Sequence, residues 1–163
     1  MIGAASAACR VANSPGPVPD PGGAAQRVAS GGYPFGDVPE EAPAMAGEPQ
    51  ADCLFCKIVS GDVPATIVRE TETTVAFRDI NPQAPCHVLV IPRAHYPDAA
   101  SLAAGAPEVA ADVLREAGEV AAGEQVDGQG YRLVFNTGAG AGQTVFHAHA
   151  HVLAGRGLAW PPG

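Results

Sequence analysis

The feature that most constrains this chain is a run near its C-terminal end in which three histidines alternate with small apolar residues. The run reads Val145-Phe-His-Ala-His-Ala-His-Val-Leu153, and its histidines are His147, His149 and His151. Successive side chains of a β-strand point to opposite faces, so a strand here carries all three imidazoles on one face, with neighbours about 6.6–6.8 Å apart. The other residues are apolar, which predicts a buried strand. Because a buried polar group without a partner is costly, each imidazole needs a metal, a carbonyl or an anionic ligand.

A single histidine on an apolar strand is usually a core residue with satisfied hydrogen bonds, but three in register favour a functional site. A glycine-rich segment, Asn136-Thr-Gly-Ala-Gly-Ala-Gly-Gln-Thr144, precedes them. Glycines let a chain turn sharply and present backbone N–H groups to an anion. Taken alone, this segment is more simply a hairpin connection. Beside the histidines it predicts a phosphate or oxyanion site, to which Gln143 and Thr144 add donors.

Length and charge exclude several classes of protein. The 163 residues are enough for one domain with a proper core, but not for two of ordinary size. No apolar run approaches the ~20 residues of a membrane span, and the N-terminus lacks a signal-peptide pattern, so we expect a soluble, cytoplasmic protein without a membrane partner. The net charge of −8, without a basic run, argues against a nucleic-acid polymer as partner. A single nucleotide stays possible because it needs only local donors.

The first 50 residues differ from the rest of the chain. They are rich in Gly, Pro and Ala, and such a segment buries too little apolar surface to offset its conformational entropy, so residues 1–50 are predicted to be a disordered extension. An irrelevant tail is favoured over a binding arm. Met45 stands shortly before the first recognisable element, so it is an alternative start, in which case residues 1–44 are not translated. The folded domain is expected over residues 51–163.

Residues from 52 onward predict an α+β domain with an antiparallel sheet, because strands mostly follow strands. A short helix is expected over residues 53–59, ending at Ser60-Gly61. A long helix is expected from Pro107 to about Gly123, with the apolar face Val109, Val113, Leu114, Ala117, Val120 and Ala121. The predicted strands cover residues 66–69, 74–79, 87–91 and 131–135, followed by the histidine run.

Taken together, these motifs resemble the histidine triad superfamily, in particular its Hint branch of nucleotide-binding proteins. The triad motif, His-φ-His-φ-His-φ-φ with φ apolar, matches His147 to Leu153. Further similar segments are Phe77-Arg-Asp-Ile-Asn-Pro-Gln-Ala-Pro85, His87-Val-Leu-Val-Ile-Pro92, Asn136 and Trp160-Pro-Pro-Gly163, and together they cover residues 53–163. The resemblance implies a HIT-like fold: a five-stranded antiparallel sheet with one long and one short helix. It also implies a homodimer in which two sheets join into ten strands, with the long helix in the interface.

The resemblance implies chemistry at phosphorus. In the family the middle histidine attacks the α-phosphorus of a nucleotide, and water then hydrolyses the nucleotidyl-imidazole; His149 occupies that position. His151 is expected to contact the phosphate and help protonate the leaving group, and His87 matches a catalytic-pocket histidine. The remaining expected nucleotide contacts are Gln143 and Thr144 to phosphate, Asp79 to the ribose, Asn136 near both, Val63, Phe77 and Ile80 around the base, and Trp160 from the partner's C-terminal tail. For the three apolar residues around the base, plain core packing is the alternative.

A cysteine pair, Cys53-x-x-Cys56, points to a metal. Cys-x-x-Cys with two histidines is a recognised tetrahedral zinc set, and His95 and His147 are the histidines that the reaction does not use. Some bacterial members of the superfamily carry zinc on such a set. Two simply buried thiols are the alternative. A zinc ion here would be structural, clamping the N-terminal segment and fixing His147.

The leading functional hypothesis is a phosphoramidase that hydrolyses the P–N bond of purine nucleoside phosphoramidates. A dinucleoside polyphosphate hydrolase of the Fhit type is the main alternative within the superfamily. Such proteins usually follow the triad with a Pro-Arg pair, whereas this chain has Ala154-Gly-Arg156. A non-catalytic zinc- or nucleotide-binding adaptor is the alternative from another class.

Overall fold

The computed structural model describes residues 47–162. Most of the predicted extension over residues 1–50 lies outside the described residues, as does the alternative start at Met45. The predicted boundary of the folded domain therefore stays a prediction.

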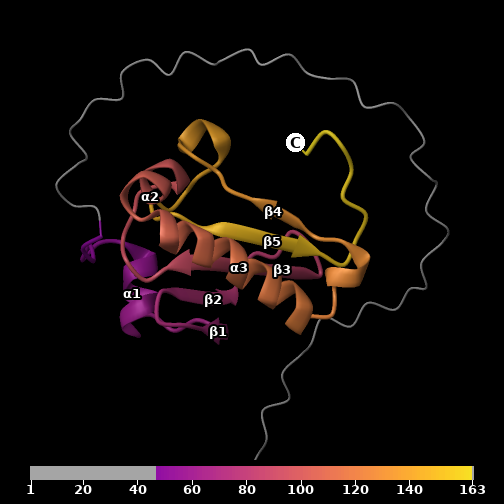
Figure 1. Cartoon of the computed structure of the whole chain (residues 1–163), viewed down its shortest axis with the longest axis horizontal. Coiled ribbons are helices and arrows are strands. Elements are labelled where there is room, and N and C mark those ends of the chain that lie inside the picture. The colour runs from indigo at the N-terminus through magenta and orange to yellow at the C-terminus, as the bar shows by residue number, and fades with distance from the viewer. Residues whose placement is uncertain (1–46, 163) are drawn as a thin grey trace, which may run out of the picture.

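A five-stranded antiparallel sheet forms the framework, in the order β1-β2-β3-β5-β4 (Figure 1). The elements in chain order are α1 Leu54–Ser60, β1 Ile67–Glu70, β2 Thr74–Arg78, β3 Cys86–Pro92, α2 Ala99–Gly105, α3 Pro107–Gly123, β4 Arg132–Val134 and β5 Ala150–Ala154, with 3-10 turns at Asp127–Gln129 and Ala139–Ala141. This confirms the predicted α+β class and the number of strands. Helix α2 was not predicted; the Asp98 side chain caps it by accepting a hydrogen bond from the Ser101 N–H.

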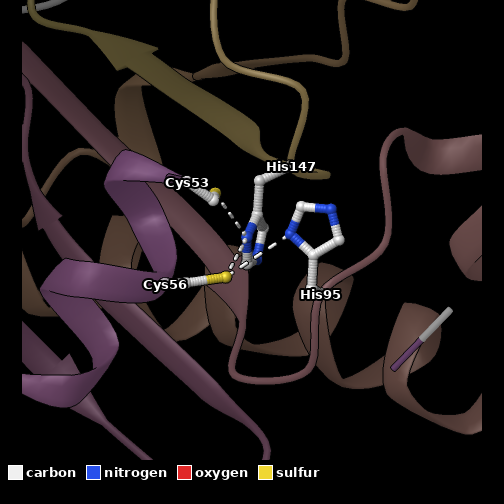
Figure 2. Close-up of side chains that lie close together, drawn as sticks. All are labelled: Cys53, Cys56, His95 and His147. Atoms are coloured by element: carbon white, nitrogen blue, oxygen red, sulfur yellow. Dashed lines mark hydrogen bonds between the residues drawn. The ribbon is translucent and has the colours of Figure 1, made fainter. Parts of the chain in front are cut away.

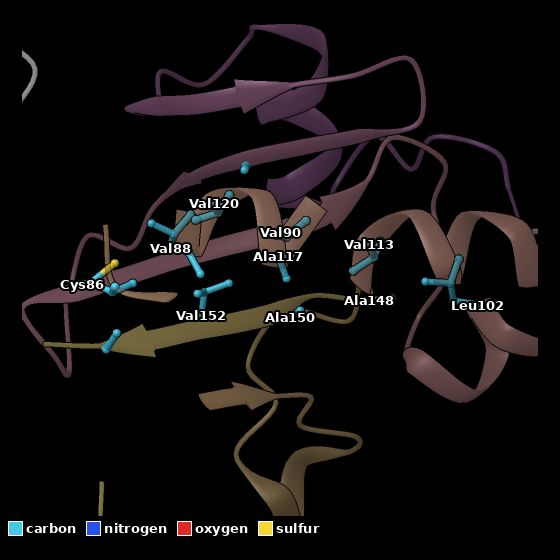
Figure 3. Packing of buried hydrophobic residues seen from close by; sticks show 14 of the residues in the cluster. Cys86, Val88, Val90, Leu102, Val113, Ala117, Val120, Ala148, Ala150 and Val152 are labelled. Carbon is cyan, nitrogen blue, oxygen red and sulfur yellow. The ribbon is translucent and has the colours of Figure 1, made fainter. Parts of the chain in front are cut away.

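The two faces of the sheet carry different side chains because strand residues alternate. Helix α3 covers one face, where Val88, Val90 and Val152 pack against its buried side (Figure 3). Helix α1 lies on the opposite face, where Phe55 packs in a smaller cluster with Val75, Phe77, Leu89 and Ile91. On β3 and β5 the same alternation places His87 and His151 on this second face. Both of these predicted site histidines therefore lie on the α1 side.

The helices largely follow the sequence signals. Gly61 ends α1 with a positive φ of 85°, a conformation that costs glycine little. Helix α3 begins at Pro107, as predicted, with the acidic Glu108 in its first turn. Leu114, which belongs to the predicted apolar face of α3, is 52% exposed in the single chain. Within residues 47–162, no helix has the length and apolarity needed to cross a membrane.

The histidine run is a correction, because β5 begins only at Ala150. The His147 N–H binds the carbonyl of Val145 at 2.9 Å, and the Ala148 N–H binds that of Tyr96 at 2.6 Å. These local and loop contacts replace the pairing with a neighbouring strand. Of the three histidines, only His151 lies in a strand. The prediction that one strand carries all three imidazoles on one face is therefore wrong for His147 and His149.

Candidate active site and metal centre

A pocket of about 330 Å³ opens on the α1 side of the sheet and brings together most of the residues predicted to bind nucleotide. From the predicted set it is lined by Val63, Phe77, Asp79, Ile80, Thr144, His149 and His151. Leu54, Phe55, Ile58 and Leu89 add apolar surface. Ile80 is 99% exposed, so it belongs to the rim. The pocket thus combines an apolar side with imidazoles and one carboxylate, as ligand pockets commonly do.

The ring of His149 is held in one tautomer. Its Nδ1 lies 2.6 Å from the carbonyl oxygen of His147, and since a carbonyl can only accept, Nδ1 carries the proton and donates it. The ring is buried and packs edge-on against Phe55, with centroids 5.3 Å apart. In the neutral imidazole Nε2 therefore has a free lone pair. This is the protonation state that a nucleophilic histidine needs.

His151 is held in a related way through His87. The Gln83 N–H donates to Nδ1 of His87 at 3.0 Å, so Nε2 of His87 carries a proton and donates it to Nδ1 of His151 at 2.8 Å. In the β3–β5 register Leu89 lies opposite His151, which makes His87 its diagonal neighbour on the same face. The proton of neutral His151 is therefore on Nε2. His87 does not line the pocket itself but contacts two residues that do: His151, and Asp79, whose Oδ2 lies 3.4 Å from Nε2 of His87. It is therefore placed as a positioning residue.

The Nε2 atom of His151 has no hydrogen-bond partner in the described part of the chain. Among residues 47–162 it is the one buried side-chain nitrogen or oxygen without a hydrogen bond. Burial, reinforced by the neighbouring His149 and His87, lowers the pKa of His151 to about 4, so the ring is neutral at pH 7. Burial also lowers the pKa of His87, although the Asp79 carboxylate opposes the shift. A buried donor without a partner, beside a pocket, points to an acceptor on a ligand.

The four predicted metal ligands converge at the end of α1 (Figure 2). Sγ of Cys56 lies 3.4 Å from Nδ1 of His95 and 3.7 Å from Nδ1 of His147, and Sγ of Cys53 lies 3.6 Å from the same His147 atom. Tetrahedral zinc, with bonds of about 2.3 Å to sulfur and about 2.0–2.1 Å to nitrogen, separates the two kinds of ligand by about 3.5 Å. The spacing therefore fits zinc.

The hydrogen bonds of His147 also suit a metal ligand. Its Nε2–H donates to the carbonyl oxygen of Pro92 at 2.9 Å, which leaves the Nδ1 lone pair facing the two sulfurs. Burial lowers the pKa of His147 to about 4, and it raises the pKa of the Cys56 thiol. Such an outer hydrogen bond to a backbone carbonyl is the usual way in which a metal-binding imidazole is oriented.

A second group, Asp79, His87 and His151, also places possible ligand atoms within 4.8 Å of one another. Here the hydrogen bonds argue against a metal. Nδ1 of His87 accepts from a backbone N–H, so its Nε2 keeps a proton, and that proton occupies the space between the two rings. The group is a hydrogen-bonded chain.

Besides His87, three residues predicted to bind nucleotide do not line the pocket in the described chain. The Gln143 amide is buried within the glycine-rich loop: it accepts from the Gly138 N–H at 2.8 Å and donates to the carbonyl oxygens of Pro97 and Val145 at 2.7 and 3.1 Å. Asn136 is half-buried outside the pocket, and Trp160 is 85% exposed. Gln143 therefore orders the loop that presents Thr144.

Two contributors escaped the sequence analysis. Phe55 packs against the rings of both His147 and His149, with centroids 5.9 and 5.3 Å apart. Its place inside the cysteine motif, on a short amphipathic helix, was a signal that could have identified it. Gln83 contributes through its backbone N–H, and no side-chain pattern reports such a contact.

Comparison with known proteins identifies the family of this chain. The HIT domain matches residues 60–158, which include all the histidines of the pocket. The chain belongs to the HIT domain family. An uncharacterised HIT-like protein of Synechocystis is 48% identical over 115 residues, covering 69% of this chain and 97% of the relative.

Two further proteins are similar to this chain. A maize protein described as a 14 kDa zinc-binding protein is 42% identical over 113 residues, covering 68% of this chain and 87% of its own length. The crystal structure of a HIT family hydrolase from Legionella pneumophila is 47% identical with a TM-score of 0.66, covering 69% of this chain and 100% of that one.

Proposed function

We propose that this HIT protein is a purine nucleoside phosphoramidase that works through a covalent nucleotidyl-His149 intermediate. The observation that carries the proposal is a pair of adjacent imidazoles, 5.0 Å apart between centroids, whose hydrogen bonds give them opposite protonation at Nε2. His149 offers a lone pair and His151 an N–H without a partner. A phosphoryl group suits both, because its phosphorus is electrophilic and its oxygens accept hydrogen bonds. The similar Legionella protein is described as a hydrolase.

The residues support two balanced steps. Nε2 of His149 attacks the α-phosphorus, a new N–P bond forms, and the bond to the leaving amine breaks. The amine nitrogen takes up a proton from solvent, while the neutral ring of His151 keeps its proton and donates a hydrogen bond from Nε2–H to a phosphoryl oxygen. Water then attacks the phosphorus, the N–P bond to His149 breaks, and the proton of the attacking water passes to solvent. The carbonyl of His147 stabilises the positive charge on His149 between the two steps.

The remaining pocket residues are proposed to bind the nucleotide. We propose that the Asp79 carboxylate binds the ribose hydroxyls; its Oδ1 already accepts from the Asn81 N–H at 2.8 Å, which fixes the group. Val63, Phe77 and Ile80 would contact the base and Thr144 the phosphate. The purine preference, like the roles of Asn136 and Gln143, stays a prediction.

We propose a structural zinc ion as a second property, bound by Cys53, Cys56, His95 and His147. The donor set and its spacing support it, as does the description of the maize relative. The ion would polarise no substrate from this position; it would hold α1 against the chain segments of His95 and His147. The four residues would then tie α1 to the segment after β3, which holds His95, and to the segment before β5, which holds His147.

We further propose a homodimer in the cytoplasm. Strand β4 is an edge strand of the sheet. In the single chain, the side chains of Tyr131, next to β4, and of Leu114, on α3, are exposed. Trp160 is also exposed, and Arg132 anchors the tail by donating to the carbonyl oxygen of Ala159 at 2.6 Å. These features would suit pairing at the β4 edge, with Trp160 reaching the partner's pocket.

The decisive assay compares three substrates on the purified protein: adenosine phosphoramidate, guanosine phosphoramidate and a dinucleoside polyphosphate. The proposal expects the phosphoramidates to be hydrolysed with the higher kcat/KM. Preference for the dinucleoside polyphosphate would favour the Fhit-type alternative. Binding of nucleotide without turnover of any of the three would favour an adaptor.

A further inference from the structure

A second pocket of about 260 Å³ adjoins the nucleotide pocket. The two share Leu54, Thr144 and Val145 as lining residues, so Thr144 stands on the boundary between them. The second pocket is also lined by Gln50, Asp52 and Phe146, none of which lines the first. None of these three residues has a part in the mechanism above.

The position of this pocket suits the leaving group. In displacement at phosphorus, the nucleoside, the attacking atom and the leaving group occupy different directions around the reacting centre. The nucleoside takes the pocket of Phe77 and Asp79, and His149 takes the direction of attack. A leaving group longer than ammonia needs further space next to the phosphate. The space that borders Thr144, the proposed phosphate contact, is the second pocket.

The lining of the second pocket indicates which leaving groups fit. Phe146 and Leu54 are 55% and 44% exposed, which is unusual for large apolar side chains and leaves surface for an apolar chain or ring. Asp52 is exposed and, apart from the proposed zinc ligand Cys53, is the one described lining residue with a formal charge at pH 7. A carboxylate beside apolar surface attracts a cation and repels an anion.

We propose that this pocket, which we call the leaving-group pocket, binds the amine portion of the substrate and selects amines with an apolar body and a cationic end. Phe146 and Leu54 contact the body, Asp52 contacts the cation, and Gln50 donates or accepts at the rim. The inference rests on the proposed phosphoramidase function and adds its substrate class: phosphoramidates of cationic amines, in preference to those of amino acids with a free carboxylate.

Four adenosine phosphoramidates test the proposal on the full-length protein. One carries ammonia, and three carry amines of equal chain length that end in an ammonium, a methyl or a carboxylate group. The wild type should show a kcat/KM for the ammonium compound about tenfold above that for the carboxylate compound, the size expected of one charge contact near a surface. Asp52→Asn should reduce this ratio to about twofold, mainly through KM, and should leave the ammonia compound unchanged.

Matched variants separate the pocket from general effects. Asp127→Asn removes an equal charge from an exposed position on the 3-10 turn after α3 and should leave the ratio unchanged. Gln50→Lys should shift preference toward the carboxylate compound without altering Asp52. Phe146→Ala should lower kcat/KM for the methyl compound but not for the ammonia compound. Zinc content is measured for each variant because Asp52 adjoins Cys53.

The outcomes distinguish the two proposals. Hydrolysis of the ammonia compound, with tail preferences that neither Asp52→Asn nor Gln50→Lys alters, overturns the leaving-group pocket and leaves the phosphoramidase intact. No hydrolysis of any of the four compounds overturns the phosphoramidase, and the leaving-group pocket with it. If Asp127→Asn reduced the ammonium-to-carboxylate ratio of kcat/KM as much as Asp52→Asn does, the preference would come from net charge. That result would also overturn the leaving-group pocket.

Discussion

Nδ1 of His149 donates a hydrogen bond of 2.6 Å to the backbone carbonyl oxygen of His147. The ring of that same His147 faces Cys53 and Cys56. One residue therefore serves two sites: its backbone fixes the tautomer of the proposed nucleophile, and its side chain belongs to the proposed zinc centre. A change at the proposed metal would reach His149 through the side chain and the carbonyl of this one residue.

The zinc centre predicts a definite metal content. Protein purified without added zinc should contain about one zinc ion per chain, as expected for one four-ligand site. Cys56→Ser should lose the metal, whereas Cys86→Ser, which alters a buried cysteine on the α3 side, should retain it. Elemental analysis measures the content. Metal-free wild type, with Cys53 and Cys56 both freely titratable in the folded protein, would support simple packing of two thiols.

His87 should act through His151 and not by direct contact. His87→Ala removes the donor that fixes the proton of His151 on Nε2, so kcat should fall about 10- to 100-fold, the range seen when an orienting partner is removed, with little change in KM. Steady-state kinetics across pH provides the measurement. His87→Gln, whose amide can donate to Nδ1, should recover part of kcat. A positioning role would be contradicted if His87→Ala and His87→Gln lost the same amount of kcat/KM and the loss came from a raised KM.

The half-buried ring of His151 should make stability depend on pH. Its pKa is lowered from 6.5 to about 4 in the folded chain, so below pH 6.5 the unfolded chain binds a proton that the folded chain does not. The free energy of unfolding is therefore unaffected by this group above pH 6.5. It falls as pH falls from 6.5 toward 4, with a slope of at most about 1.4 kcal/mol per pH unit. Denaturant unfolding at several pH values should give a shallower dependence for His151→Gln. An identical slope in the two proteins would contradict the argument.

The exposed C-terminal tail should matter more for substrate preference than for stability. Deleting residues 158–163 removes Trp160, which is 85% exposed in the single chain and so contributes little to its core. We expect a changed ranking of amine leaving groups and a free energy of unfolding within about 0.5 kcal/mol of the wild type. Light scattering tests the dimer on which this depends: a monomer at micromolar concentration would refute the assembly.

The sequence predicted the fold where local signals and burial agree. Pro107 and Glu108 marked the start of α3, Gly61 the end of α1, and the apolar run after His87 the central strand β3. These signals depend on backbone sterics and on periodicity, which a single sequence displays directly. The motif Cys53-x-x-Cys56 likewise pointed to its partner histidines, and the structure brings all four residues together.

Tertiary contacts decided what the sequence could not show. Alternation predicted one strand through all three histidines, but the Ala148 N–H binds the Tyr96 carbonyl, and strand pairing starts two residues later. Leu114 fits the helical period of α3 but lies at the border of the covered face. The tautomers of His149 and His87 depend on the backbone atoms of His147 and Gln83, whose positions are set only by the folded chain.

Trapping the covalent intermediate tests the central claim most directly. A slow phosphoramidate substrate is mixed with the protein, the reaction is quenched, and the peptide that contains residues 147–151 is analysed by mass spectrometry. The account predicts one nucleotidyl group on His149 in the wild type. It predicts none in His149→Gly, which should still bind nucleotide while kcat falls by on the order of 10⁴-fold or more. Turnover by His149→Gly at the wild-type rate, or a nucleotidyl group on a different residue, would contradict it.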